Sequence, residues 1–384
     1  MTRTLFAQTN EVDEPDLAMI ELIAQLELDN NLQKNAIGLI FGDFAQTAPG
    51  FLTALNERLP FDVVGVSAAL SISPKIMEDY CLLTLVVLTS DECQFVTGLS
   101  EDIDEHGVEC LEDLYGQLAG GLGDPPSLVL CYAAKLTTAF GGDRVVNKLN
   151  DLTGAVPIFG SIACAFDSLI SNSILFYNGQ FYTDRVALIM IEGPIRPKFS
   201  FFQIPENKIL KRKAIVTSSS GNVVKRINGM PALDYLKTIG LFMNSHSEYA
   251  DNIPLIVEDH QLGWWYPVMI MALADDAIIC THDVRENNTL GIGGCDDGYV
   301  LKSASQLAEE LKWEHFDFCL IHSCQGRHIS LGLDYLGEIE ILRTELGGHQ
   351  PFSLSYSGGE FCPRPSGDGY LNAFHCLSLC CCRF

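Results

Sequence analysis

Positive charge is scarce in this sequence. The 384 residues contain 24 Lys and Arg against 49 Asp and Glu, which gives a formal net charge of -25. An acidic surface of this kind repels phosphate backbones and anionic lipid headgroups. The charge balance therefore argues against nucleic-acid binding and against binding to a membrane surface, and it is typical of a soluble protein.

Long apolar runs and a secretory leader are missing as well. The most apolar stretches, such as Leu82–Leu88 and Val186–Ile191, are far shorter than the roughly 20 residues that span a bilayer. The N-terminal sequence MTRTLFAQTNEVDEPDL has neither the basic head nor the apolar segment of a signal peptide. We therefore expect a cytoplasmic protein whose 14 cysteines are mostly reduced.

The cysteines lack metal-binding spacing. Five of them crowd the C-terminal end together with one histidine, but no Cys-x-x-Cys pair occurs, and adjacent cysteines on a strand point to opposite faces. These residues are Cys362, His375, Cys376, Cys380, Cys381 and Cys382. Small buried apolar side chains explain them better than zinc does, so we expect no metal and no other cofactor.

A repeated order of elements is the main positive feature. An apolar strand is followed by an amphipathic helix, a second strand that ends in a small Gly/Ser turn, and a last apolar strand. The three copies span residues 35–88, 127–193 and 316–382. Helices that alternate with continuously apolar strands indicate an α/β fold. We expect mixed, largely buried sheets flanked by helices.

The segment GPIRPKFSFFQIP at 193–205 interrupts this pattern with three prolines and a glycine. It predicts a boundary between two intimately packed domains, 1–204 and 205–384. In α/β sheets, ligands collect beyond the carboxyl ends of the strands. That rule points to the turns at Gly65–Ser67, Gly160–Ser161 and Ser357–Gly359 and to the polar segment HSCQGR at 322–327.

The segment HSCQGRH allows two kinds of chemistry. Cys324 could be a nucleophile assisted by His322, which lies two residues away on the same strand face. However, no residues that would form an oxyanion hole can be identified from the sequence. Alternatively, the guanidinium of Arg327 could clamp a carboxylate while Glu360 meets an ammonium group, an arrangement that suits an amino acid. A third interpretation is that Arg327 and Glu360 pair only with each other.

Weaker candidates surround this segment. Ser67, Ser161 and Ser323 could present hydroxyls to a ligand at the strand ends, or they could satisfy nearby backbone groups. The three aromatic residues of QLGWWYPVMIM, 261–271, could wall a pocket or fill an ordinary core.

Several stretches together carry a family resemblance. They include AIGLIFGDF, FDVVGVSAALS and VPIFGSIACAF in the first half, and GNVVKRINGMPALDYLKTIG, LIHSCQGRHISLG and PFSLSYSGGEFCP in the second. The strongest matches are Pro231–Leu233, Ser323–Cys324 with Arg327, and Gly359–Glu360 ahead of a closing strand that contains Asn372. In their order and spacing over nearly the whole chain, these motifs resemble the FIST family, with its FIST N and FIST C parts.

The resemblance implies a sensory domain of the kind found in bacterial and some eukaryotic signalling proteins. We expect a stand-alone intracellular sensor that binds a small polar metabolite, with amino acids as candidates, and signals to a protein partner. The expected ligand-binding residues are Arg327, Glu360, Ser323, Cys324, Ser67 and Ser161. The alternative functions are a cysteine-dependent hydrolase or transferase centred on Cys324, and an acidic scaffold for a basic protein.

Overall fold

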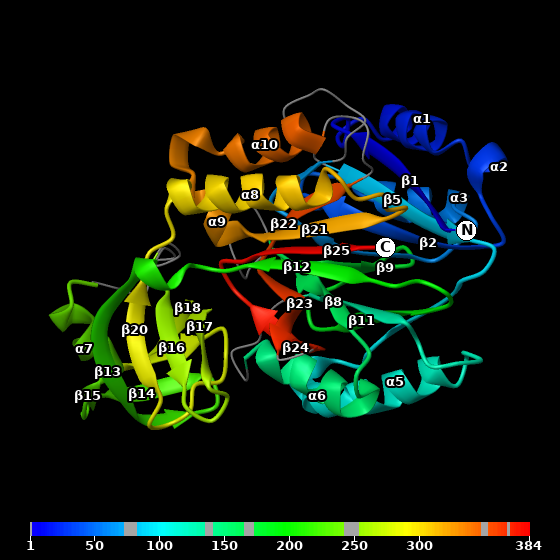
Figure 1. The fold of residues 1–384 in the computed structure, drawn as a ribbon. Helices are drawn as coiled ribbons and strands as arrows, with labels where there is room; N and C mark the ends of the chain where they lie inside the picture. Colours follow the sequence, from blue (N-terminus) through cyan, green and yellow to red (C-terminus); the bar gives the residue numbers. More distant parts are fainter. Residues whose placement is uncertain are drawn as a thin grey trace.

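The computed structural model describes residues 2–72, 83–134, 141–164, 173–241, 253–346, 352–366 and 369–384. It confirms the predicted α/β class: several mixed sheets are flanked by helices. Figure 1 shows the arrangement, with α8 and α10 on one side of the strands, α5 and α6 on the opposite side, and a separate group of strands beside them. In the described part of the chain, no helix is long and apolar enough to cross a membrane.

Three units share one topology. The first contains β1 (Thr2–Thr9), α1 (Pro15–Leu26), α2 (Leu28–Asn31), β2 (Asn35–Gly42), α3 (Phe51–Arg58), β3 (Val63–Ser67), β4 (Ser71–Ile72) and β5 (Leu83–Ser90). The second contains β6 (Gln94–Leu99), α4 (Ile103–His106), α5 (Cys110–Ala119), β7 (Leu128–Ala133), α6 (Asp143–Thr153), β8 (Ile158–Ile162), β9 (Leu175–Tyr177), β10 (Gln180–Tyr182) and β11 (Val186–Glu192). The third contains β12 (Lys198–Phe202), α8 (Asp297–Leu311), β21 (Cys319–Cys324), α9 (Gln325–Ser330), α10 (Gly337–Leu346), β22 (Ser353–Ser357), β23 (Gly359–Ser366), β24 (Gly369–His375) and β25 (Leu379–Arg383).

Each unit builds its own sheet in the same strand order. The four strands run β1-β5-β2-β3 in the first unit, β6-β11-β7-β8 in the second and β12-β25-β21-β22 in the third. In every unit the central strand is parallel to the next strand of the repeat and antiparallel to the last. The repetition predicted from the sequence is therefore a repetition of topology, with one sheet for each copy.

The units also exchange strands. Beyond the second strand of each repeat, the chain crosses to a neighbouring sheet: β4 pairs with β22, β9 with β3, and β23 with β8. Three backbone hydrogen bonds mark the crossing. The amide of Ala69 donates to Tyr356 at 3.4 Å, that of Cys164 to Ser67 at 2.9 Å, and that of Gly358 to Ile162 at 2.8 Å. These bonds link the three units in a closed cycle with approximate threefold symmetry, and we call them the backbone triangle.

Alternating residues of the central strands explain why the strands are apolar throughout. In β2, Leu39 and Phe41 face a core shared by all three units, whereas Ile40 packs against the helices of its own unit. The rings of Phe41, Tyr132 and His322 meet in that shared core, with centroids 5.5 to 6.0 Å apart and no solvent exposure. The central strand of each sheet is thus buried on both faces, as expected for continuously apolar strands.

A mainly β-stranded insertion interrupts the third unit between β12 and α8. This β-domain contains β13 (Ile209–Ser220), β14 (Val223–Ile227), β15 (Met230–Pro231), α7 (Ala232–Thr238), β16 (Leu255–Asp259), β17 (Trp264–Val268), β18 (Ile270–Ala274), β19 (Ala277–Cys280) and β20 (Thr289–Gly293). It has its own apolar core. The boundary predicted at 204/205 separates β12 from β13, so the third sheet draws strands from both sides of it.

Close approach of β2 and β3 makes a sharp stability test. A β-carbon on Gly65 would lie 1.8 Å from the carbonyl oxygen of Ile40, and Gly160 occupies the equivalent tight position beside Cys131. We predict that Gly65→Ala lowers the free energy of unfolding by about 3 kcal/mol or more, because the strands must separate. Gly116→Ala is the control: it lies in exposed helix α5 with nothing within 4 Å, and should stabilise slightly. Urea unfolding measures both, and equal midpoints would contradict the close approach.

Candidate functional site

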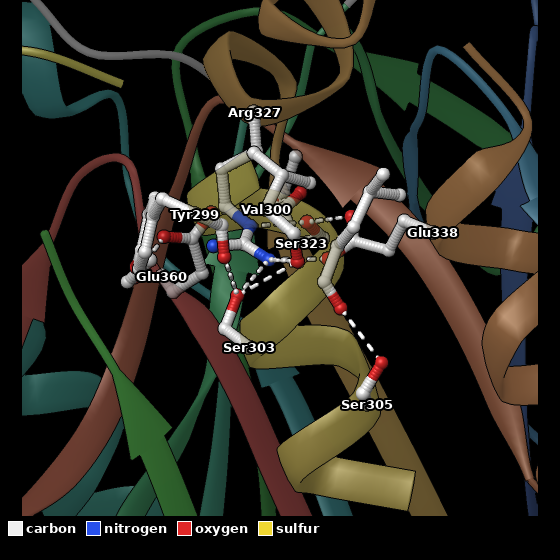
Figure 2. Close-up of polar contacts among 11 residues, drawn as sticks. Tyr299, Val300, Ser303, Ser305, Ser323, Arg327, Glu338 and Glu360 are labelled. Atoms are coloured by element: carbon white, nitrogen blue, oxygen red, sulfur yellow. Dashed lines mark hydrogen bonds and ion pairs between the residues drawn. The ribbon is translucent and has the colours of Figure 1, made fainter. Parts of the chain in front are cut away.

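Arg327 lies in the short helix that follows β21, and its side chain has no solvent exposure. Figure 2 shows the guanidinium among side chains from α8, from the end of β21 and from α10. The turn after a central strand has therefore placed a permanent positive charge inside the third unit. A buried charge is costly unless it is paired and hydrogen-bonded, so the partners of Arg327 decide what it can do.

Those partners are all found within the third unit. Nη2 forms an ion pair with Glu338 at the start of α10 and donates to Ser303 at 2.8 Å. Nε donates to Ser323 at 3.1 Å, and the Ser323 hydroxyl in turn donates to Glu338 at 2.7 Å. The guanidinium also lies 5.0 Å from the ring centroid of Tyr299. Burial alone would lower the pKa of Arg327, but the charge of Glu338 raises it.

Glu338 is thus the ion-pair partner of Arg327. Between described residues the structure contains no ion pair that joins Arg327 to Glu360, which was the pairing considered from the sequence. The sequence does hold a signal for Glu338. It lies four residues before Leu342, and Leu346 follows after four more, so all three share the buried face of α10. A carboxylate on such a face requires a buried partner.

Glu360 lies on the exchanged strand β23 and is also fully buried. Its carboxyl group accepts hydrogen bonds from Ser357, at 2.8 Å, and from Ser378. Burial raises the pKa of Glu360 to about 8, although the two serine hydroxyls and the charge of Arg327 pull it down. The group therefore holds its proton at neutral pH. Ser357 belongs to the third turn noted in the sequence, whereas Ser378 was not among the residues singled out there.

Several buried polar atoms near these charges have no hydrogen-bond partner among the described residues. They include the hydroxyls of Ser161 and Tyr299 and Nη1 of Arg327. Ser161 lies directly opposite Glu360 in the pairing of β8 with β23. We call Arg327, Glu360, Ser161 and Ser323 the strand-end cluster. Four of the six residues expected to bind a ligand are gathered in it.

Ser67 has a different position. It pairs with Gly42, whereas Ser161 pairs with Tyr132, the counterpart of Phe41. When the two repeats are aligned on their strand registers, Ser161 corresponds to Val66, the residue before Ser67. The two serines are therefore not structurally equivalent, although their turns have similar sequences. The Ser67 hydroxyl accepts a hydrogen bond from the amide of Ile174 at 2.9 Å, so it satisfies a backbone group of the neighbouring segment.

Cys324 ends β21 with 5% of its surface exposed. Burial raises the pKa of its thiol well above the usual range, and the nearby carboxyl group of Glu360 adds to the effect. Burial lowers the pKa of His322 to about 3, and its Nδ1 contacts the Ser355 hydroxyl at 2.8 Å. A protonated thiol beside a neutral imidazole is not an activated nucleophile. Among the described residues, no group of His, Cys, Asp and Glu is arranged to hold a metal.

The pairing of Arg327 with Glu338 predicts a large effect on stability. Glu338→Ala leaves a guanidinium buried without its counter-charge, which typically costs about 3–5 kcal/mol. Glu340→Ala, on the exposed face of the same helix, is the control and should change the free energy of unfolding by less than about 0.5 kcal/mol. Chemical denaturation of both variants checks this, and a small effect of Glu338→Ala would mean that Arg327 finds its main partner elsewhere.

Comparison with known protein families gives a match that covers most of the first two units. The model of the FIST N domain matches residues 36–230, from β2 to the first hairpin of the β-domain and about half of the chain. The resemblance noted in the second half lies mostly outside that match. A comparison with curated proteins gives no match. On the family match, the chain belongs to the FIST family, whose FIST N domain is a sensory, small-ligand-binding domain of signal transduction proteins.

Proposed function

We propose that this chain is an intracellular sensor that binds a small polar metabolite at the strand-end cluster, with amino acids as the ligand class. The observation that carries the proposal is the unused hydrogen-bonding capacity of buried groups. Within the part of the chain that the structure describes, Nη1 of Arg327 and the hydroxyl of Ser161 have no partner, and both residues are fully buried. Buried polar groups are nearly always paired, so each orphan suggests a missing partner.

An α-amino acid would complement these groups. Its carboxylate can accept a hydrogen bond from Nη1 of Arg327, a charge-assisted contact. Its ammonium group can donate to Glu360 and Ser161, which lie opposite each other on paired strands. Glu360 holds its proton without a ligand, because burial raises its pKa to about 8. An ammonium group would favour the ionised carboxylate, so binding would release that proton.

Burial of the cluster also bears on signalling. Arg327 and Glu360 have no exposed surface, so a ligand reaches them only if the elements above the strand ends move apart. A ligand that stabilises one arrangement of these elements shifts their equilibrium by its difference in affinity for the two arrangements. Arg327 is hydrogen-bonded to Ser303 of α8 and ion-paired with Glu338 of α10. A ligand-induced change at Arg327 would therefore move these two helices, where a signalling partner could detect it.

The alternative function, a cysteine-dependent hydrolase or transferase, has less support. Cys324 is buried and its thiol is protonated for the reasons given above. Selective alkylation of Cys324 well below pH 8 would show a depressed thiol pKa and would favour the enzyme over the sensor.

Ligand binding is tested by calorimetric and thermal-shift titration of the intact chain with the twenty common amino acids. At least one should bind, and at 100 times its Kd it should stabilise the fold by about 2.7 kcal/mol. Glu360→Gln should weaken binding because it removes the negative charge that meets the ammonium group, and Ser161→Ala should weaken it because it removes a hydroxyl acceptor. Glu340→Gln, at an exposed position, should leave it unchanged. Failure of all twenty to bind, or equal binding by Glu360→Gln, would sink the proposal.

The raised pKa of Glu360 predicts a pH dependence of stability. Between about pH 4.5 and 8 the folded state holds a proton that the unfolded state has lost. The stability from this group is therefore complete below that window and falls as pH rises through it, by at most about 1.4 kcal/mol per pH unit. We expect the difference in unfolding free energy between the natural protein and Glu360→Gln to decline from pH 5 to pH 8. A constant difference would mean that Glu360 titrates normally.

A further inference from the structure

A cavity of about 600 Å³ lies away from the strand-end cluster, where α6 and β24 meet the β-domain. Its walls therefore come from the second unit, the third unit and the insertion. Figure 1 shows α6 and β24 next to the side of the β-domain that carries β16 and β17. Clefts between parts of a chain are frequent places for small ligands, and this volume is within the usual range.

Aromatic rings form one wall of the cavity. Trp264, Tyr266, His282 and Phe374 follow one another, with successive centroid distances of 5.6, 5.0 and 4.7 Å. The first two belong to the aromatic segment noted in the sequence. Burial lowers the pKa of His282 to about 4, and its Nε2 contacts the carbonyl of Phe374 at 3.2 Å. The histidine is therefore a neutral member of the wall.

Negative charge dominates the polar part of the lining. Five carboxylates stand against two arginines: Asp143, Asp151, Asp259, Asp283 and Glu286, with Arg144 and Arg285. Both arginines are already paired, Arg144 with Asp283 at 2.6 Å and Arg285 with Asp259 at 3.4 Å. Three carboxylates remain without a cation from the lining. An anionic ligand is therefore disfavoured, and a cationic one is favoured.

Asp143 is the best placed of these three. It begins α6, and its Oδ1 accepts a hydrogen bond from the amide of Asp283 at 2.9 Å. No cation from the described residues forms an ion pair with it. Burial and the charge of Asp283 raise the pKa of Asp143 to about 7, against the opposite effect of Arg144. In the same lining, the buried indole Nε1 of Trp264 has no acceptor among the described residues. The guanidinium of Arg364 lies 3.4 Å from the centroid of the Trp264 ring, so one face of this ring already contacts a cation and the other face is the one proposed to contact a ligand.

We propose that this cavity binds a small organic cation, a primary or quaternary amine on an apolar or aromatic body, with Asp143 as its counter-ion and the aromatic rings as its contact surface. Cations are attracted to the faces of Trp and Tyr rings. The carboxylate supplies the opposite charge at the edge of the same cavity. The site shares no residue with the strand-end cluster, so it stands or falls independently of the amino-acid proposal.

The test is calorimetric titration of the intact chain with tyramine, choline and tetramethylammonium, and with 4-hydroxyphenylacetate as the anionic counterpart of tyramine. At least one amine should bind, and the anion should not. Asp143→Asn keeps an acceptor for the amide of Asp283 but removes the charge, and should weaken amine binding at least about tenfold. Trp264→Leu should weaken it by about threefold or more.

Two controls separate this site from other effects. Asp124→Asn changes an exposed carboxylate outside the cavity, and should leave amine binding unchanged. Glu340→Gln should also leave it unchanged, because Glu340 is exposed on α10 and does not line this cavity. Absence of binding by all three amines, equal binding of the anion, or full affinity in both Asp143→Asn and Trp264→Leu would each overturn the proposal.

The pH dependence gives a second readout. The groups that surround Asp143 electrostatically are Asp283, Arg144, Tyr266 and Cys376. Burial raises the pKa of Tyr266 and Cys376, so both stay neutral near pH 7, and Asp283 is held in its pair with Arg144. A primary amine stays protonated throughout this range. Tyramine affinity should therefore rise from pH 6 to pH 8 as Asp143 ionises, and it should be flat in Asp143→Asn.

Discussion

The backbone triangle is the constraint on which the rest of this structure depends. Each of its hydrogen bonds joins the end of one unit's second strand to the chain of another unit. The bonds form in a core from which water is excluded, where backbone groups must be paired. They therefore fix the three sheets relative to one another, and they fix which residue of each strand reaches the centre. The ring contacts of Phe41, Tyr132 and His322 follow from that register.

The same geometry explains why polar groups gather at the strand ends. The sheets converge there, so side chains from β8, β21 and β23 come within reach of one another although they are distant in the sequence. A polar group at this place is buried whether or not it has a partner. Arg327 has Glu338 as its partner, and Glu360, whose pKa burial raises to about 8, is hydrogen-bonded to two serine hydroxyls. In the proposed function, the groups of the cluster that are left unpaired are the ones that would contact a ligand.

The sequence predicted the elements better than their partners. Apolar strands and amphipathic helices are local patterns, and the three copies were visible because their central strands are buried on both faces. The exchange of β4, β9 and β23 leaves no local pattern, because which sheet a strand joins depends on contacts with residues distant in the sequence. Likewise, Arg327 was identified by its position after β21, but its pairing with Glu338 depends on how α10 packs. The turns of Ser67 and Ser161 look alike in sequence, yet only the strand register shows that they are one residue out of step.

Strand exchange has a further consequence for how this chain can fold during synthesis. The first unit gives β4 to a sheet whose strands β21, β22 and β25 follow much later in the sequence, and the second unit waits for β23 to cover β8. Contacts between segments so far apart in the sequence form slowly, because the intervening chain must be closed into a loop first. Until these later strands have been synthesised, the early sheets present open edges that allow wrong pairing. Chaperone protection of these edges during translation would therefore matter more here than in a protein whose repeats fold one at a time.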